Sequence, residues 1–157
     1  MTMRTLCWLA MVALGLACLA GCNTAGDETM ESTTVITSEN ISRIVGVRWI
    51  LQKINIDGNE YDVSGDRPYV EFSDGGRISG FTSINRCSGL MQLDDQGRAL
   101  WSPFASTKMA GPPELMKQES IFLEALPRVQ RLSIEGTHLT GHSEDDQVEL
   151  VFRVAVQ

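Results

Sequence analysis

Residues 45–56 read VGVRWILQKINI, and the spacing of their apolar side chains indicates the fold class. Four apolar residues recur at every second position: Val45, Val47, Trp49 and Leu51. That period is typical of a β-strand with one buried face. Asp57-Gly58-Asn59 follows and indicates a tight turn. The segment predicts a strand that turns back after residue 56 into an antiparallel sheet.

Short strands and turns continue on both sides of one helix. Further strands are expected at residues 69–72, 77–82, 90–93, 99–101, 129–134, 138–140 and 148–156. Pro113 at the first turn and Pro127 past the end bracket an amphipathic helix at about residues 113–126. The predicted fold class is mainly β (α+β), with a compact curved antiparallel sheet or partly open barrel carrying one amphipathic helix.

Glu119 lies in the middle of the apolar stripe of this helix, between Leu115, Phe122 and Leu126. It is therefore expected to face inward. Burial of an unpaired carboxylate is costly, so Glu119 needs hydrogen-bond donors, and the backbone amides near residues 107–110 are the candidates. The alternative places Glu119 at the edge of the stripe, in water.

The length and charge of the chain exclude several classes of protein. The 157 residues suffice for one folded domain. The chain carries 20 acidic and 13 basic residues, a net charge of −7. Proteins that bind the phosphate backbone need a basic surface, so nucleic acid is not an expected partner.

The N-terminus has the pattern of a bacterial lipoprotein signal peptide. After Arg4, residues 6–20 carry no charge and are too few to span a bilayer as a helix. They lead into Leu19-Ala20-Gly21-Cys22, which resembles a lipobox and implies cleavage before Cys22 and acylation of its thiol. Cleavage after Ala20 by ordinary signal peptidase, or an uncleaved anchor, are the alternatives. Asn23 favours the outer membrane, facing the periplasm, or the cell membrane if the host has only one.

Residues 23–42 read NTAGDETMESTTVITSENIS and predict a flexible tether. Five Thr, three Ser and four acids occupy twelve of these twenty positions, a composition that buries little apolar surface. The expected organisation is a signal peptide at 1–21, a lipidated Cys with its tether at 22–42, and a folded domain at 43–157. An edge strand at Val35-Ile36 is the alternative for the tether.

Cys87 is the thiol that remains after export. Cys7 and Cys18 leave with the signal peptide and Cys22 is acylated, so no internal disulfide is possible. Cys87 is expected to be buried as a small apolar residue, or else to be a site of oxidation or intermolecular pairing.

The sequence carries no strong pattern for catalysis, a metal or a cofactor. His138 and His142 have the i, i+4 spacing of a metal pair on a helix, but they lie on an expected strand. The segment 57–68 ends in Pro68 where a calcium loop requires Glu. A dyad of Cys87 with either histidine is the arrangement that a small hydrolase would use.

Motifs along the domain occur in a characteristic order. They are Trp49–Ile54 with Gly58, Pro68–Phe72, Gly76–Gly80, Trp101–Ala110, Glu119 with Phe122 and Leu126, Gly136–Leu139 and Leu150–Phe152. Together they resemble the META domain, the family of the HslJ-type heat-shock lipoproteins. The resemblance implies a compact, mainly antiparallel β fold with one helix, and no established enzymatic activity or catalytic residue.

Two positions depart from the family pattern. The family commonly has Cys at the positions of Ile84 and Gly111, and the resemblance implies that these two positions lie close together. Without a bridge, packing of Ile84 must hold the Asn85 loop against the start of the helix. Thr107 and Trp49 complete the set of expected structural residues.

Three functional hypotheses follow. The first is a non-enzymatic, lipid-anchored envelope protein with a binding or stress-tolerance role, whose partners are the membrane and an envelope protein. The second is an inhibitor of a basic, lysozyme-like hydrolase, because removal of Arg4 with the signal leaves 12 basic and 20 acidic residues, a net charge of −8. The third is a small hydrolase that uses Cys87.

Overall fold

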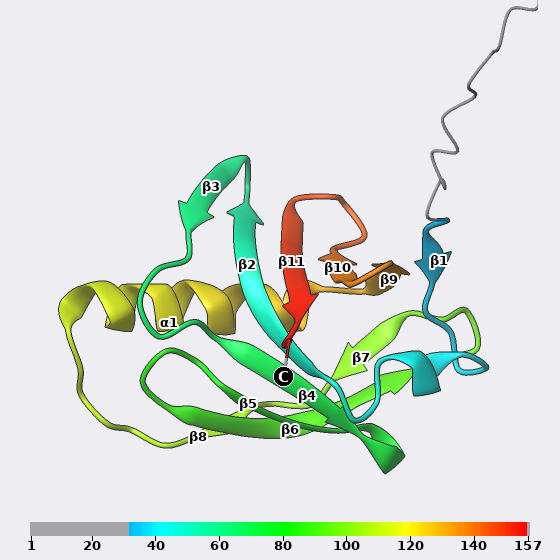
Figure 1. The fold of residues 1–157 in the computed structure, drawn as a ribbon, viewed down its shortest axis with the longest axis horizontal. Helices are drawn as coiled ribbons and strands as arrows, with labels where there is room; N and C mark the ends of the chain where they lie inside the picture. Colours follow the sequence, from blue (N-terminus) through cyan, green and yellow to red (C-terminus); the bar gives the residue numbers. More distant parts are fainter. Residues whose placement is uncertain (1–31, 157) are drawn as a thin grey trace, which may run out of the picture. The chain divides into compact units, whose positions relative to one another are not determined.

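The computed structural model describes residues 32–156, and Figure 1 shows their fold. The strands of the single antiparallel sheet are β1 (Thr34–Val35), β2 (Arg48–Ile56), β3 (Asn59–Asp62), β4 (Tyr69–Ser73), β5 (Arg77–Phe81), β6 (Arg86–Leu93), β7 (Ala99–Trp101), β8 (Ala105–Ser106), β9 (Arg131–Glu135), β10 (His138–His142) and β11 (Val148–Val154). The described residues form one α-helix, α1 (Pro113–Ala125), which continues as a 3-10 turn over Leu126–Arg128. The predicted fold class is confirmed.

The strand order is β1-β9-β10-β11-β2-β4-β5-β6-β7, with β3 paired to β2 and β8 paired to β6. β2 is the central strand because it pairs with β11 on one side and with β3 and β4 on the other. The sheet curls, and α1 passes behind β2 and β11 in Figure 1. The first long strand of the chain therefore joins its two halves.

The core fills the space between the inner face of the curled sheet and α1. Trp49 and Leu51 of β2 are buried in the expected period of two. An irregularity in the pairing with β11 then shifts the buried side to Ile54 and Ile56. Phe122 of α1 meets Phe152 of β11 edge to face, with ring centroids 6.4 Å apart. Burial of one such side chain contributes roughly 1.5–3 kcal/mol, so this contact anchors the helix on the sheet.

The helix begins and ends where its prolines predict. Pro113 occupies the first turn, where a missing backbone N–H removes no helical hydrogen bond. The α-helical hydrogen bonds give way to the 3-10 turn that contains Pro127. No helix within residues 32–156 is long and apolar enough to cross a membrane.

The expected flexible tether over 23–42 is wrong for its last part. Thr34 and Val35 pair with Ile134 and Ser133 of β9, so the edge strand is what the chain forms. Ile36 is completely buried, and its N–H donates to Leu132 O at 2.8 Å. Val35 and Ile36 are the apolar residues of this part of the segment, and they are enough to order it. The Ile36 side chain fills the core, while the backbone of Thr34 and Val35 extends the sheet. Residues 22–31 of the expected tether lie outside the described part.

Trp49 holds the segment that leads from β1 into β2. Its side chain is buried, and the indole Nε1–H donates to Ile44 O at 3.1 Å. Ile44 is itself fully buried beside a short 3-10 turn over Ile41–Arg43. The expected structural residue Trp49 therefore lies in the core and satisfies its polar atom there.

Candidate functional site

The turn between β5 and β6 contains a group of buried polar residues. Thr82, Ser83 and Asn85 are nearly inaccessible to water. Thr82 donates both its N–H and its hydroxyl to Asn85 O, at 2.8 and 2.9 Å, and Ser83 adopts a φ of 92°. This left-handed conformation is unusual for a residue other than glycine, so the turn is held tightly by its surroundings.

Asn85 is the centre of this group. Its Oδ1 accepts from Met109 N at 2.7 Å and from Thr107 Oγ1 at 2.8 Å. Its Nδ2 donates to Glu119 Oε1 at 2.8 Å and to Met109 O at 3.2 Å. One side-chain amide thereby uses its donors and its acceptor to join the β5–β6 turn, the segment before the helix, and α1.

Glu119 is half-buried and accepts hydrogen bonds from Asn85 alone among the described residues. The Asn85 backbone N–H donates to Glu119 Oε2 at 3.2 Å, in addition to the side-chain contact. The expected donors in residues 107–110 are therefore wrong. The Met109 N–H donates to the side-chain oxygen of Asn85 instead of to Glu119. The side-chain nitrogen of Asn85 then donates to the Glu119 carboxylate.

Ile84 and Gly111 are in contact. A Cβ placed on Gly111 would lie 2.6 Å from Ile84 Cδ1, so a larger residue here would displace the Ile84 side chain. The backbone of Gly111 has no positive φ, which means that the requirement is for space and not for a special conformation. Packing of Ile84 thus occupies the place where the family pattern has a second cysteine.

Gln118 forms a second amide contact that the sequence analysis missed. It is buried, and its Nε2 donates to Ser83 Oγ at 2.7 Å. Its Oε1 accepts from Ser64 N at 2.9 Å. A polar residue next to Glu119 on the same helix was the available signal. Gln118 and Glu119 together fix α1 to both ends of the β5–β6 turn.

Cys87 lies on β6, directly after this turn, and is buried. Removal from water raises the pKa of its thiol to about 11, and the negative charge of Glu119 adds to the effect. At neutral pH about one thiol in ten thousand is then ionised. Cysteine nucleophiles need the thiolate, so this environment disfavours the hydrolase hypothesis.

An open groove of about 500 Å³ lies over the outer face of the sheet, and Cys87 is one of its lining residues. Arginine, tyrosine, serine and threonine side chains line it, together with one acid: Arg48, Tyr69, Glu71, Ser79, Arg86, Ser88, Ser106 and Thr107. The lining contains neither histidine, so the dyad that hydrolysis would need is not formed there. The groove is therefore an open surface lined mainly by polar side chains.

Charged contacts pre-organise one wall of this groove. Arg48 Nε lies 2.6 Å from Glu71 Oε1, and the Arg48 guanidinium stacks 4.3 Å from the centre of the Tyr69 ring. Tyr69 in turn stacks on Phe81, with ring centroids 6.1 Å apart. Guanidinium groups stack favourably on aromatic faces, so the Arg48–Tyr69–Phe81 stack has a defined geometry.

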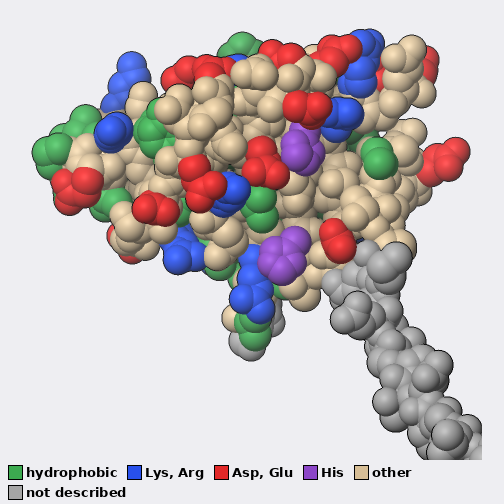
Figure 2. All heavy atoms as spheres, turned by 90° about the horizontal axis from the view of Figure 1, so that it is seen from above, with side chains coloured by type: hydrophobic (Ala, Val, Ile, Leu, Met, Phe, Trp, Pro, Cys, Tyr) green, Lys and Arg blue, Asp and Glu red, His purple; other side chains and the backbone are tan. Residues whose placement is uncertain are grey.

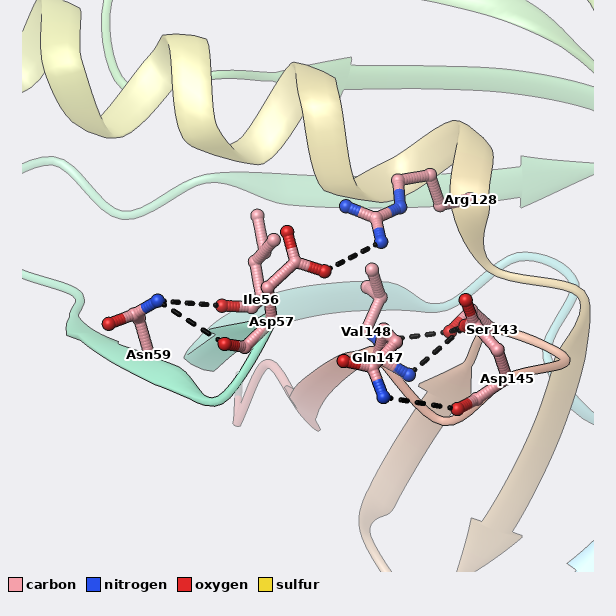
Figure 3. Close-up of polar contacts among 8 residues, drawn as sticks. All are labelled: Ile56, Asp57, Asn59, Arg128, Ser143, Asp145, Gln147 and Val148. Carbon is pink, nitrogen blue, oxygen red and sulfur yellow. Dashed lines mark hydrogen bonds and ion pairs between the residues drawn. The ribbon is translucent and has the colours of Figure 1, made fainter.

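Acidic side chains gather at the tips of the β2–β3 and β10–β11 turns, and two of them have hydrogen-bond partners that Figure 3 draws. Figure 3 shows Asp57 of the β2–β3 turn accepting from Arg128 Nη2 at 3.0 Å. Asp145 of the β10–β11 turn accepts from Ser143 Oγ at 2.6 Å and from Gln147 N at 3.1 Å. Figure 2, seen from above, shows acidic and basic side chains interspersed around the two histidines. Glu144, Asp145 and Asp146 are three consecutive exposed acids at the tip of the β10–β11 turn, and among the described residues only Asp146 forms an ion pair, with Arg131. An exposed cluster of acids at a loop tip is the feature that the inhibitor hypothesis would favour.

Of the residues singled out from the sequence, the structure brings five together: Asn85, Thr107, Glu119, Ile84 and Gly111. Trp49 lies apart from them, in the core near the chain's first described residues. Cys22 lies outside the described residues.

Comparisons with known proteins agree on the fold. The protein is similar to one from Burkholderia xenovorans solved by NMR, with 20% identity, a TM-score of 0.62, and coverage of 74% of this chain and 86% of that one. It is also similar to a DUF4847 family protein from Bacteroides vulgatus, with 13% identity, a TM-score of 0.56, and coverage of 74% and 97%. No curated protein matches the sequence.

The family is shown by the sequence itself. The model of the META domain matches residues 42–156, which is nearly the whole of the described chain. The match includes the β5–β6 turn, the segment before the helix, and α1. The chain belongs to the META domain family.

Proposed function

We propose that this protein is a lipid-anchored lipoprotein of the cell envelope whose META domain acts by binding and not by catalysis. The anchor is Cys22, exposed when the signal peptide is removed at Leu19-Ala20-Gly21-Cys22. The segment from Cys22 to Thr34 reaches at most about 40 Å when fully extended. The domain therefore stays close to the membrane surface, and Asn23 favours the periplasmic face of an outer membrane.

The observation that carries the binding role is the contrast between the buried thiol of Cys87 and the open groove that this residue lines. The thiol is buried and protonated, whereas the groove is open and polar. A site whose thiol is not ionised, and which has several exposed hydrogen-bonding groups, can bind a ligand without reacting with it. The biological role that fits such an anchored domain is tolerance of envelope stress.

Metabolic labelling with a palmitate analogue, followed by membrane fractionation, tests the anchor. The wild-type protein should take up the label and sediment with the outer membrane, whereas Cys22→Ser should lose both properties. Cys87→Ser is the matched control, because it removes a thiol without touching the lipobox, and it should keep the label. Equal labelling of Cys22→Ser and wild type would overturn the proposed anchor.

A pull-down of the lipidated protein from an envelope extract tests how the domain acts. Retention of an envelope component that it does not modify supports the binding role. Release of a cleaved product on prolonged incubation, abolished by Cys87→Ser, would contradict it and return the hydrolase hypothesis. Selective capture of a cationic hydrolase with loss of that enzyme's activity would support the inhibitor instead.

A further inference from the structure

The outer face of β4, β5 and β6 has an order that follows from the strand register. Glu71 lies opposite Ser79, and Ser79 lies opposite Ser88, which gives one row of polar side chains. A parallel row runs from Tyr69 to Phe81 and on to Arg86. Figure 1 shows the three strands side by side, with β8 along the edge of β6. Five residues of these rows line the groove described above: Tyr69, Glu71, Ser79, Arg86 and Ser88.

The charge of this face is opposite to that of the whole protein. The outward positions of the three strands carry one acid, Glu71, and two arginines, Arg77 and Arg86. Arg48 of the adjoining β2 neutralises Glu71. Within residues 32–156, neither Arg77 nor Arg86 forms an ion pair. A chain with a net charge of −7 therefore presents two uncompensated cations on one strand face.

The backbone around Arg86 is fixed, while its side chain is not. Arg86 N donates to Thr107 Oγ1 at 3.2 Å, and Arg86 O accepts from Thr107 N at 3.1 Å. Thr107 is fixed in turn by its hydroxyl contact with Asn85. The buried network thus fixes the backbone from which the Arg86 side chain extends, and Arg86 lines the groove together with Ser79 and Ser88.

We propose that the groove binds an anionic saccharide, with its carboxylate or phosphate oxygens on Arg86. Guanidinium groups pair with such oxygens in two parallel hydrogen bonds. Hydroxyls of the sugar would meet Ser79 and Ser88, and the sugar ring would lie against Tyr69, which also lines the groove. A concave site with few apolar side chains suits a glycan better than a flat lipid surface. The proposal deepens the binding role above by naming its ligand.

Binding of a short oligogalacturonate to the Cys22→Ser chain, measured by isothermal titration calorimetry, tests the proposal. A neutral malto-oligosaccharide of the same length should bind more weakly, and added salt should weaken the acidic ligand further. Arg86→Gln should lower the affinity for oligogalacturonate by roughly tenfold or more. Arg153→Gln is the matched control, since Arg153 is an exposed strand arginine on β11, and it should leave the affinity unchanged.

Several outcomes would overturn the proposal. One is the absence of binding at about 1 mM ligand, the weak end of specific recognition. Equal affinity for the acidic and the neutral saccharide is another. Binding of phosphatidylglycerol vesicles that depends on Arg86, without binding of oligogalacturonate, would assign the face to the membrane. Because this chain carries no lipid, failure of the saccharide proposal is independent of failure of the anchor.

Discussion

The side-chain amide of Asn85 donates to the carboxylate of Glu119 at 2.8 Å, across a sequence separation of 34 residues. The same amide accepts the Met109 N–H, so a single side chain closes the gap between a β-turn and the helix. Such a residue has no apolar substitute, because removal of either partner leaves a polar group without its hydrogen bond.

We expect Asn85→Ala to lower the free energy of unfolding by about 2–3 kcal/mol and Glu119→Ala by about 1–2 kcal/mol. The double variant should lose less than the sum, with a coupling energy of about 1 kcal/mol, because each single change already breaks the shared contact. Urea denaturation of the four proteins measures these values.

Glu124→Ala is the control for this cycle, since Glu124 lies on the same helix and is exposed. It should leave the urea midpoint within error. If Glu119→Gln and Glu119→Ala both leave the midpoint unchanged as well, the contact with Asn85 does not contribute to stability and the account of the turn is wrong.

The contact of Ile84 with Gly111 makes a cross-link feasible. We expect Ile84→Cys with Gly111→Cys, in a Cys22→Ser and Cys87→Ser background, to form a disulfide under oxidising conditions. The chain-entropy model values closure of this loop at roughly 3–4 kcal/mol, so the melting temperature should rise. Loss of two hydrogens in the intact mass and a shift on reduction are the readouts.

Size variants at the same pair test the packing separately. Gly111→Ala alone should cost about 1–3 kcal/mol, because a Cβ would collide with Ile84. Combination with Ile84→Ala should recover part of that loss by making room. A Gly111→Ala variant as stable as wild type would mean that the two residues are farther apart than described.

The edge strand β1 contributes to the domain although the family match begins after it. We expect Ile36→Ala to lower the free energy of unfolding by about 2–4 kcal/mol, since Ile36 is completely buried. Its neighbour Val35 is 57% exposed, and Val35→Ala should cost about 0.5 kcal/mol or less. If the two changes lowered the free energy of unfolding equally, the segment would be a flexible tether and not an edge strand of the domain.

The pKa of Cys87, raised to about 11 by burial and then by Glu119, predicts a slow thiol. In the Cys22→Ser chain, alkylation by iodoacetamide at pH 8 should be about a hundredfold slower than in urea. The pKa of Cys87 is higher in the folded than in the unfolded chain, so the protonated thiol favours folding. This contribution of Cys87 to the free energy of unfolding is complete below about pH 8.5 and is lost as the pH rises through 11.

Glu119→Gln separates the two causes of that pKa shift. It removes the negative charge but not the burial, so the reaction rate of Cys87 should rise modestly. Alkylation of folded Cys87 as fast as in urea would show instead that the thiol is accessible and ionised.

The sequence allowed prediction of the long strands and the helix, because each has a strong local signal. The first half of β2 alternates, and α1 is bracketed by prolines. The start of β6 at Arg86 was not predicted, since the residues before Leu90 are polar or small. Their extended conformation depends on the pairing of Cys87 with Gly80 on one side and Ser106 on the other.

The site was only partly predictable for the same reason. The unusual place of Glu119 on an apolar stripe signalled a buried contact, but not its partner. Asn85 and Gln118 act through contacts with residues far away in the sequence, so the family pattern singled out Asn85 without its partners, and the helix position of Gln118 was only a weak signal. The overall acidic composition also gave no sign of the basic face. Arg77 and Arg86 share that face only because of how β5 and β6 pair.

The measurement that tests the central claim most directly is mass spectrometry of the N-terminal peptide of the protein isolated from its own membrane. The account predicts a peptide that begins at Cys22 and carries a thioether-linked diacylglycerol. An unmodified peptide that begins at Gly21 or Cys22 would contradict it, because the META domain would then have no lipid to hold it at the envelope surface.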